Sequence, residues 1–231
     1  MSDRRIVALL PMKGHSERVQ GKNWRDFGGR PLFRWILDTL LSIPAITTVV
    51  INTDARALLQ SHGLPQSERV LVRDRKAEIC GDFVSMNLVI ADDVANVRAD
   101  TYLMTHATNP LLGASTIRAA LAAFDRARAE GRADSLFTVN RFQTRFYRQD
   151  GSPVNHDPNE LKRTQDLEPW FEENSNLYIF TATSFNQTRA RIGRQPMLFE
   201  TPRLESVDID DEEGWKTAEL LARGSAAEPP R

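Results

Sequence analysis

The amino-acid sequence predicts a single α/β domain of three layers, in which helices cover both faces of a mostly parallel sheet. Short apolar runs alternate with amphipathic segments through most of the chain, an order typical of strand–helix–strand units. The first run, from Ile6 to Leu10, is apolar at every position, as expected of a central strand that is covered on both faces. With 231 residues, of which 41% are hydrophobic, the chain is long enough for one substantial core.

The remaining elements follow from periodicity. A helix begins near Pro31, and its apolar residues Leu32, Trp35, Ile36 and Leu40 share one face. Further strands are predicted at residues 46–52, 68–73, 101–105, 135–140, 176–180 and 204–210, and further helices at 54–62, 84–97, 115–130 and 211–223. Residues 1–223 therefore form one predicted domain, and we expect 224–231 to be a disordered tail.

The alternation stops between Arg141 and Glu173. This stretch is rich in Arg, Gln, Asn, Asp and Pro and has little periodicity. A long irregular segment inside a compact domain is usually functional or part of an interface. We therefore predict an excursion from the core at 141–173.

Composition excludes several classes of protein. Thirty basic and 31 acidic residues give a formal net charge of −1, so no overall positive field would attract nucleic acid or a membrane surface. The one cysteine, Cys80, excludes an internal disulfide and multi-cysteine metal sites. No apolar run approaches the length of a bilayer span. We expect a cytoplasmic protein.

The loop after the first strand is the first candidate site, because ligands of open α/β sheets bind beyond the carboxyl ends of the strands. Its sequence is LPMKGHSERVQGKN, and its glycines, hydroxyl and cations suit a polyphosphate. The spacing fits neither a P-loop nor the GxGxxG fingerprint. A solvated surface loop is the alternative.

This loop resembles the N-terminal motif of the acylneuraminate (sialic acid) cytidylyltransferase family, R-x-x-S-x-R/G-x-x-x-K-N. The resemblance implies a Rossmann-like nucleotidyltransferase fold and a loop that wraps the triphosphate of CTP. The CTP contacts that it implies here are Lys13, Gly14, Ser16, Arg18, Lys22 and Asn23. Lys13 replaces the family's first arginine and cannot make its bidentate contact, and Gln20 stands where proline is common.

The resemblance extends from Ile6 to about Leu221. NTDARAL resembles the family's STD element beside the nucleotide, which makes Asn52 and Asp54 candidates; a helix N-cap is the alternative role for Asp54. RKAEICGDFVSMN resembles the segment whose arginine contacts cytosine, which places that role on Arg75. A surface arginine is the alternative.

SVDID is the candidate metal site. In a strand, Asp208 and Asp210 would share one face and could hold one hard cation. The family's D-x-D binds the catalytic Mg²⁺, so the resemblance implies that Asp208 and Asp210 are its ligands. It also implies that Lys22 is a catalytic residue, whose positive charge acts on the phosphates. The alternative is an acidic helix N-terminus, which Asp211, Glu212 and Glu213 also suit.

THATNPLL resembles the family's Q-P-T-S-P-L-R element at the sugar site. His106 replaces its glutamine and Leu112 its arginine, while Thr108 matches. In the excursion, the resemblance suggests sugar contacts by Lys162, Arg163 and Gln165, in a homodimer whose excursions reach the partner.

The expected activity is transfer of CMP from CTP to an acidic sugar of the sialic or nonulosonic type, with release of pyrophosphate and with Mg²⁺ as cofactor. A 3-deoxy-octulosonate cytidylyltransferase and a nonenzymatic nucleotide-binding protein are the alternatives. Neither nucleic acid nor a membrane is an expected partner.

Overall fold

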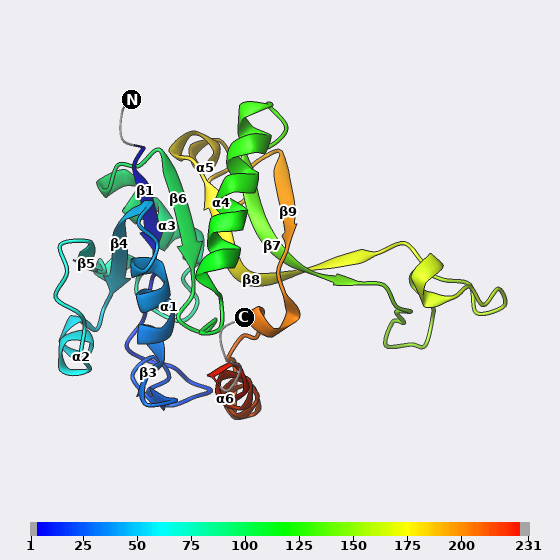
Figure 1. Cartoon of the computed structure of the whole chain (residues 1–231), viewed down its shortest axis with the longest axis horizontal. Helices are drawn as coiled ribbons and strands as arrows, with labels where there is room; N and C mark the ends of the chain where they lie inside the picture. The colour runs from blue at the N-terminus through cyan, green and yellow to red at the C-terminus, as the bar shows by residue number, and fades with distance from the viewer. Residues whose placement is uncertain (1–3, 227–231) are drawn as a thin grey trace.

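The computed structural model describes residues 4–226, which form a three-layer α/β domain with one projecting arm (Figure 1). The main sheet has the order β5-β4-β1-β6-β8-β7-β9, and all neighbouring strands are parallel except where β8 takes part. The predicted mostly parallel sheet is confirmed. Its strands are β1 (Ile6–Leu9), β4 (Ile46–Thr53), β5 (Val70–Asp74), β6 (Thr101–Thr105), β7 (Ser135–Phe142), β8 (Trp170–Phe180) and β9 (Pro196–Glu200).

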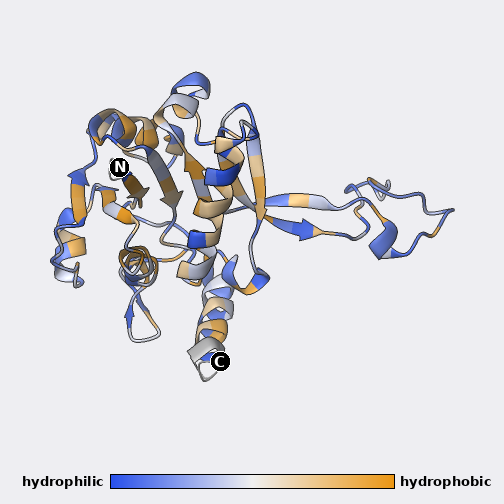
Figure 2. Ribbon diagram, turned by 45° about the horizontal axis from the view of Figure 1, so that its top comes forward, coloured by the Kyte–Doolittle hydropathy of each residue, from blue (hydrophilic) through white to orange (hydrophobic). Residues whose placement is uncertain are grey.

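Helices cover both faces of this sheet. On one face, α1 (Leu32–Leu41), α2 (Arg56–Ser61) and α4 (Ala114–Ala129) share a buried apolar cluster with the central strands. On the other face, α3 (Met86–Asn96) and α5 (Ala182–Thr188) complete a second cluster. Figure 2 shows hydrophobic residues concentrated on the sheet and on the helix sides that face it. Burial of these stripes explains why the 3.6-residue periodicity located α1, α2, α3 and α4, whereas the short helix α5 was not predicted.

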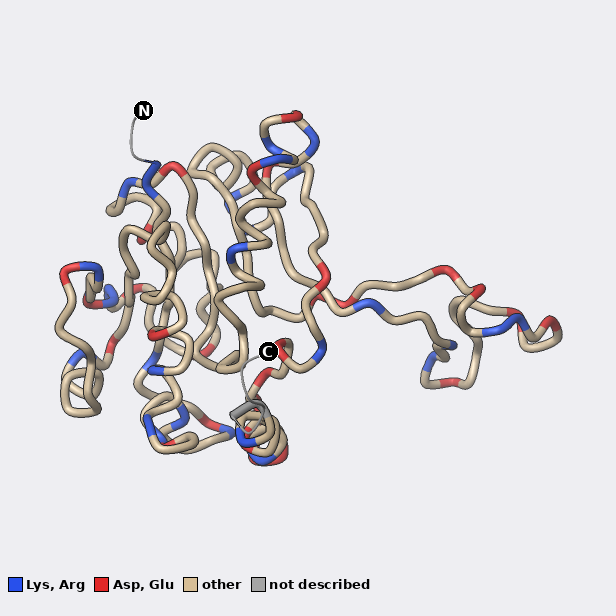
Figure 3. The backbone as a smooth tube through the Cα atoms, viewed as in Figure 1, with Lys and Arg blue, Asp and Glu red and all other residues tan. Residues whose placement is uncertain are grey.

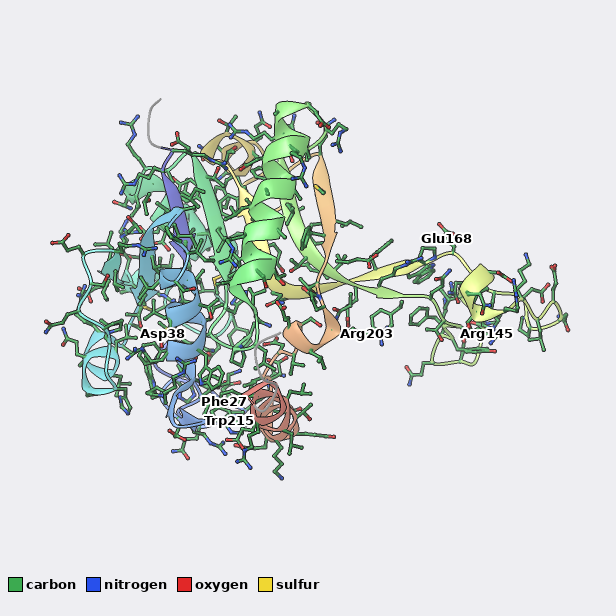
Figure 4. All side chains as sticks on the ribbon, viewed as in Figure 1. Phe27, Asp38, Arg145, Glu168, Arg203 and Trp215 are labelled. Atoms are coloured by element: carbon green, nitrogen blue, oxygen red, sulfur yellow. The ribbon has the colours of Figure 1, made fainter. Side chains whose placement is uncertain are left out.

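A third, smaller cluster joins the C-terminal helix α6 (Glu212–Ala226) to the first loop and to a short hairpin, β2 (Asp26–Phe27) and β3 (Arg30–Pro31). Phe27 and Trp215 meet edge to face, with ring centroids 5.4 Å apart, and they lie together in Figure 4. Val19 from the first loop and Ile209 from the segment before α6 pack into the same cluster. This cluster therefore fixes two candidate site segments against each other.

The arm is formed by the ends of β7 and β8 and by the residues between them. The strands stay paired as far as Phe142 and Trp170; beyond them the chain contains one isolated bridge between Tyr147 and Pro153, the short helix η2 (Thr164–Asp166) and irregular turns. Figure 3 shows charges of both signs along the arm, and Figure 2 shows it as predominantly hydrophilic. The excursion predicted at 141–173 corresponds to this arm.

Two predictions about the C-terminal region were wrong. Residues 204–210 are not a strand: the short helix η3 (Arg203–Glu205) is followed by irregular backbone. The amide of Ile209 donates to the carbonyl of Thr108 at 2.9 Å, and its carbonyl accepts from Lys22 at 2.6 Å, so its backbone groups are paired with loops. The predicted tail also begins too early, because α6 continues through Ala226; residues 227–231 lie outside the described range.

Other elements also differ from the prediction: the hairpin of β2 and β3 was not predicted, and β8 begins at Trp170 instead of residue 176. The edge strand β9 was not predicted, and α3 begins at Met86, two residues late, where Ser85 caps it by accepting from the amide of Asn87. Within residues 4–226, no helix combines the length and the apolar character needed to cross a membrane.

Candidate functional site

A cleft of about 380 Å³ lies between the first loop and the segment from Ile79 to Val89. Its lining residues follow the carboxyl ends of β1, β5 and β6, as expected of an open α/β sheet. Eight of the predicted site residues line it: Lys13, Ser16, Arg18, Lys22, Asn23, Arg75, His106 and Thr108. The structure thus brings together residues from three separate sequence segments: the first loop, the segment that begins at Arg75, and the THATNPLL motif.

The first loop is held by the candidate Asp54 and by a hydrogen bond within the loop itself. The amide of Gly14 donates to Asp54 Oδ1 at 2.7 Å, and a Cβ at Gly14 would lie 2.8 Å from that of Ala55, so only glycine allows this approach. Asn23 Nδ2 donates to the carbonyl of Lys13 at 3.0 Å. Asp54 therefore supports the loop, and α2 has no side-chain cap, which corrects the N-cap alternative.

Hydrogen bonds to Asn52 and Met12 hold the guanidinium of Arg75 in place and leave one of its nitrogens free. Its Nε donates to Asn52 Oδ1 at 3.1 Å, and its Nη2 donates to the carbonyls of Met12 and Asn52 at 3.1 and 2.9 Å. Nη1 has no partner among the described residues and is the atom available to a ligand in the cleft. Asn52 itself is fully buried and outside the cleft, so it positions Arg75 and does not line the site.

A buried ionic network supports Asn52 in turn. Asn52 Nδ2 donates to Asp93 Oδ1 at 2.9 Å, and Arg73 pairs with both Asp93 and Asp92. Burial raises the pKa of Asp93 to about 6, against the opposing hydrogen bond from Asn52 and charge of Arg73. The supporting contacts of Arg73, Asp92 and Asp93 behind Asn52 were not predicted.

Lys22 connects the cleft to the predicted metal ligands. Its Nζ donates to the carbonyl of Ile209 at 2.6 Å and lies 4.0 Å from Asp210 Oδ1, and 12% of the side chain is exposed. Burial lowers the pKa of Lys22, while the charges of Asp210 and Asp208 oppose the shift. Arg18 Nη2 also contacts Asp210 Oδ1, at 3.1 Å.

Asp208 and Asp210 do come close together, although not as neighbours on a strand face. Burial raises the pKa of Asp208, a hydrogen bond from Thr108 opposes this, and the charge of Asp210 adds to it. Asp208 Oδ1 is buried and has no hydrogen-bond partner among the described residues. An unpaired buried carboxylate oxygen is unfavourable unless a cation or donor covers it, so this atom fits a bound cation.

The residues suit Mg²⁺ better than a metal held wholly by protein. In the described part of the chain no group of three or more His, Cys, Asp or Glu side chains could hold a metal ion. Mg²⁺ commonly takes one or two carboxylates and completes its shell with water and phosphate oxygens. Asp208 and Asp210 could supply those carboxylates.

An ion pair between Lys13 and Asp82 spans the cleft. The hydrogen bond from Lys13, followed by its charge, lowers the pKa of Asp82. Asp82 was not predicted as a site residue, although it lies in the same segment as Arg75.

Two residues near the sugar-site motif form a contact that sequence reasoning missed. Arg191 Nη1 lies 3.4 Å from Nε2 of His106 and donates to it. Burial lowers the pKa of His106 to about 3, and the positive charges of Arg191 and Lys22 act in the same direction. Arg191 precedes β9, far along the chain from His106, and no local motif marks it.

The predicted sugar contacts of the arm lie outside the cleft of their own chain. Arg163 makes a bidentate pair with Asp166 at 2.8 and 3.0 Å, and Lys162 lies 3.9 Å from Glu160. Gln165, the third of these residues, contributes its carbonyl to Gln143 within the arm. The arm carries all three away from the domain, in the direction of the labelled Arg145 and Glu168 in Figure 4.

The model of one protein family matches residues 7–217, and that family is described as cytidylyltransferase. The chain belongs to the cytidylyltransferase family. It is therefore a nucleotidyltransferase enzyme, as predicted, and the resemblance to CMP-sialic acid synthetases is confirmed.

Relatives of the chain include a pseudaminic acid cytidylyltransferase from Campylobacter jejuni, 23% identical over 226 residues, an alignment that covers 93% of this chain and 95% of the relative. An N-acylneuraminate cytidylyltransferase from Oncorhynchus mykiss is 27% identical over 94% of this chain and 50% of the relative. A solved CMP:2-keto-3-deoxy-manno-octonic acid synthetase complexed with CTP superimposes with a TM-score of 0.68 at 13% identity, covering 96% of this chain and 99% of the other. At that identity the last comparison supports the fold alone.

Proposed function

We propose that this cytidylyltransferase joins the CMP part of CTP to an acidic nonulosonic sugar and releases pyrophosphate. The observation that carries the proposal is the position of Lys22, whose ammonium lies between the cleft and the Asp208–Asp210 segment. A phosphate bound there would meet fixed cations on one side and a possible metal site on the other. The curated relatives named for pseudaminic and acylneuraminic acids favour a nonulosonic acceptor.

In this proposal the chain binds CTP through three groups of atoms. The free Nη1 of Arg75 contacts the base, and the loop cations Lys13 and Arg18 contact the triphosphate. Binding requires Lys13 to leave its ion pair with Asp82. Ser16 adds a hydroxyl donor on the same wall.

Transfer follows as an in-line displacement. The anomeric hydroxyl oxygen of the sugar forms a bond to the α-phosphorus, the bond from that phosphorus to the bridging oxygen of pyrophosphate breaks, and the hydroxyl proton passes to water. Lys22 neutralises charge that develops on the phosphate oxygens. Mg²⁺, held by Asp208 and Asp210, would supply further charge neutralisation when bound.

We also propose a homodimer in which each arm reaches the acceptor site of the partner. The arm cannot bring Lys162 and Arg163 to the cleft of its own chain, because it extends away from the domain. Where the paired strands of the arm end, the rings of Phe146 and Trp170 stack with their centroids 5.5 Å apart, and the neighbouring Phe171 is exposed. The single cysteine remains in agreement with a cytoplasmic protein.

A pyrophosphate-release assay tests the proposal. The enzyme with CTP and Mg²⁺ is given neuraminic, legionaminic and pseudaminic acids and, separately, 3-deoxy-octulosonate. We expect release with at least one nonulosonic acid and none with UTP. Release with the octulosonate alone would establish the alternative acceptor, and no release with any sugar would contradict the proposed activity.

A further inference from the structure

Arg191 lies between the root of the arm and the cleft, and its guanidinium is held on several sides. Its Cζ is 3.7 Å from the centroid of the Tyr178 ring, and its Nη2 lies 3.3 Å from Glu173 Oε1. The hydroxyl of Tyr178 donates to the same oxygen of Glu173. Both partners belong to β8, so the strand that enters the arm also orients this guanidinium.

The contact with His106 fixes the protonation of the imidazole. A guanidinium has donors and no acceptor, so the ring nitrogen that faces Arg191 Nη1, Nε2, must carry a lone pair. A neutral ring with an unprotonated Nε2 carries its proton on Nδ1. The charged groups around the ring are Arg191 and Lys22, with Glu173 beyond Arg191, and the two cations disfavour the imidazolium form.

We propose that Arg191 is a positioning residue that locks His106 in the Nδ1–H tautomer, so that His106 offers a hydrogen-bond donor to an oxygen of the acceptor sugar. Nδ1 has no partner among the described residues, and His106 lines the cleft. The assignment of this oxygen to the acceptor rests on the proposed function. In this arrangement His106 is not the base that deprotonates the attacking hydroxyl, because its only lone pair is engaged.

Nitrogen-15 NMR of the histidine rings tests the tautomer without any turnover. In the ligand-free protein we expect one ring in which Nδ1 is protonated and Nε2 is not, assigned by its loss in His106→Gln and unchanged between pH 5 and 8. Arg191→Met should release the ring to tautomer exchange. Arg194→Met, in the same loop but at an exposed position, is the matched control and should leave the signal unchanged. A wild-type His106 protonated at Nε2 would overturn the proposal.

Steady-state kinetics test the acceptor contact. Loss of one neutral hydrogen bond corresponds to about 0.5–1.5 kcal/mol, so Arg191→Met should raise the KM of the acceptor about 2- to 13-fold while the KM of CTP stays within about twofold. His106→Gln retains a donor and should bind the acceptor better than His106→Leu. Equal acceptor KM values in these two variants would remove the proposed contact. If the enzyme proved inactive with every acceptor, the NMR result would still decide the tautomer.

Discussion

Replacing Lys22 by methionine removes the ammonium while keeping an unbranched side chain of similar length. In the wild type this ammonium donates to the carbonyl of Ile209 and faces Asp210 at the edge of the cleft. Because the positive charge is already fixed before the substrate binds, it stabilises the transition state without reorganisation. The variant tests whether this charge acts in catalysis or only in packing.

We expect Lys22→Met to lower kcat greatly and to change the free energy of unfolding little. Removal of one preorganised donor from an oxyanion site typically lowers kcat about 10²- to 10³-fold. A lost hydrogen bond from a charged group corresponds to at most about 1.5–3 kcal/mol. Burial already disfavours the ammonium of Lys22, as its lowered pKa indicates, so the net change in unfolding free energy should be below this range.

Pyrophosphate release measured against CTP concentration gives kcat and KM, and thermal unfolding shows that the variant is folded. Lys216→Met on α6, where the lysine is exposed, is the matched control and should keep kcat within about twofold of the wild type. As pH rises, the lowered pKa means that Lys22 loses its proton earlier than a free lysine, so wild-type activity should fall at alkaline pH and this limb should be absent from Lys22→Met. Near-normal kcat and KM in Lys22→Met would refute the catalytic role.

Three further predictions concern the carboxylates and the arm. Asp208→Asn and Asp210→Asn should each lower activity by orders of magnitude and require more Mg²⁺, with little change in Tm; unaltered Mg²⁺ titrations would favour an acidic helix terminus instead. The raised pKa of Asp93 means that the folded state keeps a proton between pH 4 and 6 that the unfolded state has released, so its contribution to stability is lost as pH rises through this window. Relative to Asp93→Asn, the wild type should therefore lose at most about 1.4 kcal/mol of unfolding free energy per pH unit, and parallel curves would contradict the shift. Arg163→Ala should weaken binding of the acceptor more than binding of CTP. If each site is shared between two chains, a mixed dimer of Arg163→Ala and Lys22→Ala has one site without either change, so activity should return after subunit exchange. No recovery despite exchange would place each site within one chain.

The apolar pattern predicted the fold well where burial determines it. The run from Ile6 to Leu9 is buried at every position because β1 lies at the centre of the sheet. The edge strand β9 has a weaker pattern, since exposed residues alternate with half-buried ones, and it pairs only with β7. Nothing local distinguishes such a segment from a loop.

The SVDID segment shows where pattern and structure separate. Only its last two residues alternate in burial: Ile209 is fully buried and Asp210 is exposed, whereas Val207 and Asp208 are both half-buried. Ile209 is buried in the small cluster with Val19 and Trp215, and its backbone bonds to Lys22 and Thr108 prevent a strand. The sequence pattern alone cannot distinguish a side chain that is buried as part of a strand from one that is buried in a small cluster outside the sheet.

The sequence located the part of the cleft that is formed by one short motif, the first loop. The loop cations line the cleft, whereas Asn52 and Asp54 proved to lie one layer behind it. A sequence does not reveal whether a polar side chain faces the ligand or supports a residue that does. Arg191 could not be found at all, because only the tertiary structure brings it to His106.

The most direct test of the proposed activity uses an acceptor whose anomeric hydroxyl carries oxygen-18. Incubation with CTP and Mg²⁺ is followed by phosphorus NMR and mass spectrometry of the products. Attack by the sugar on the α-phosphorus predicts a CMP-sugar with the label in the bridging oxygen, together with unlabelled pyrophosphate. Label in the pyrophosphate, or an unlabelled bridge, would contradict this account of the reaction.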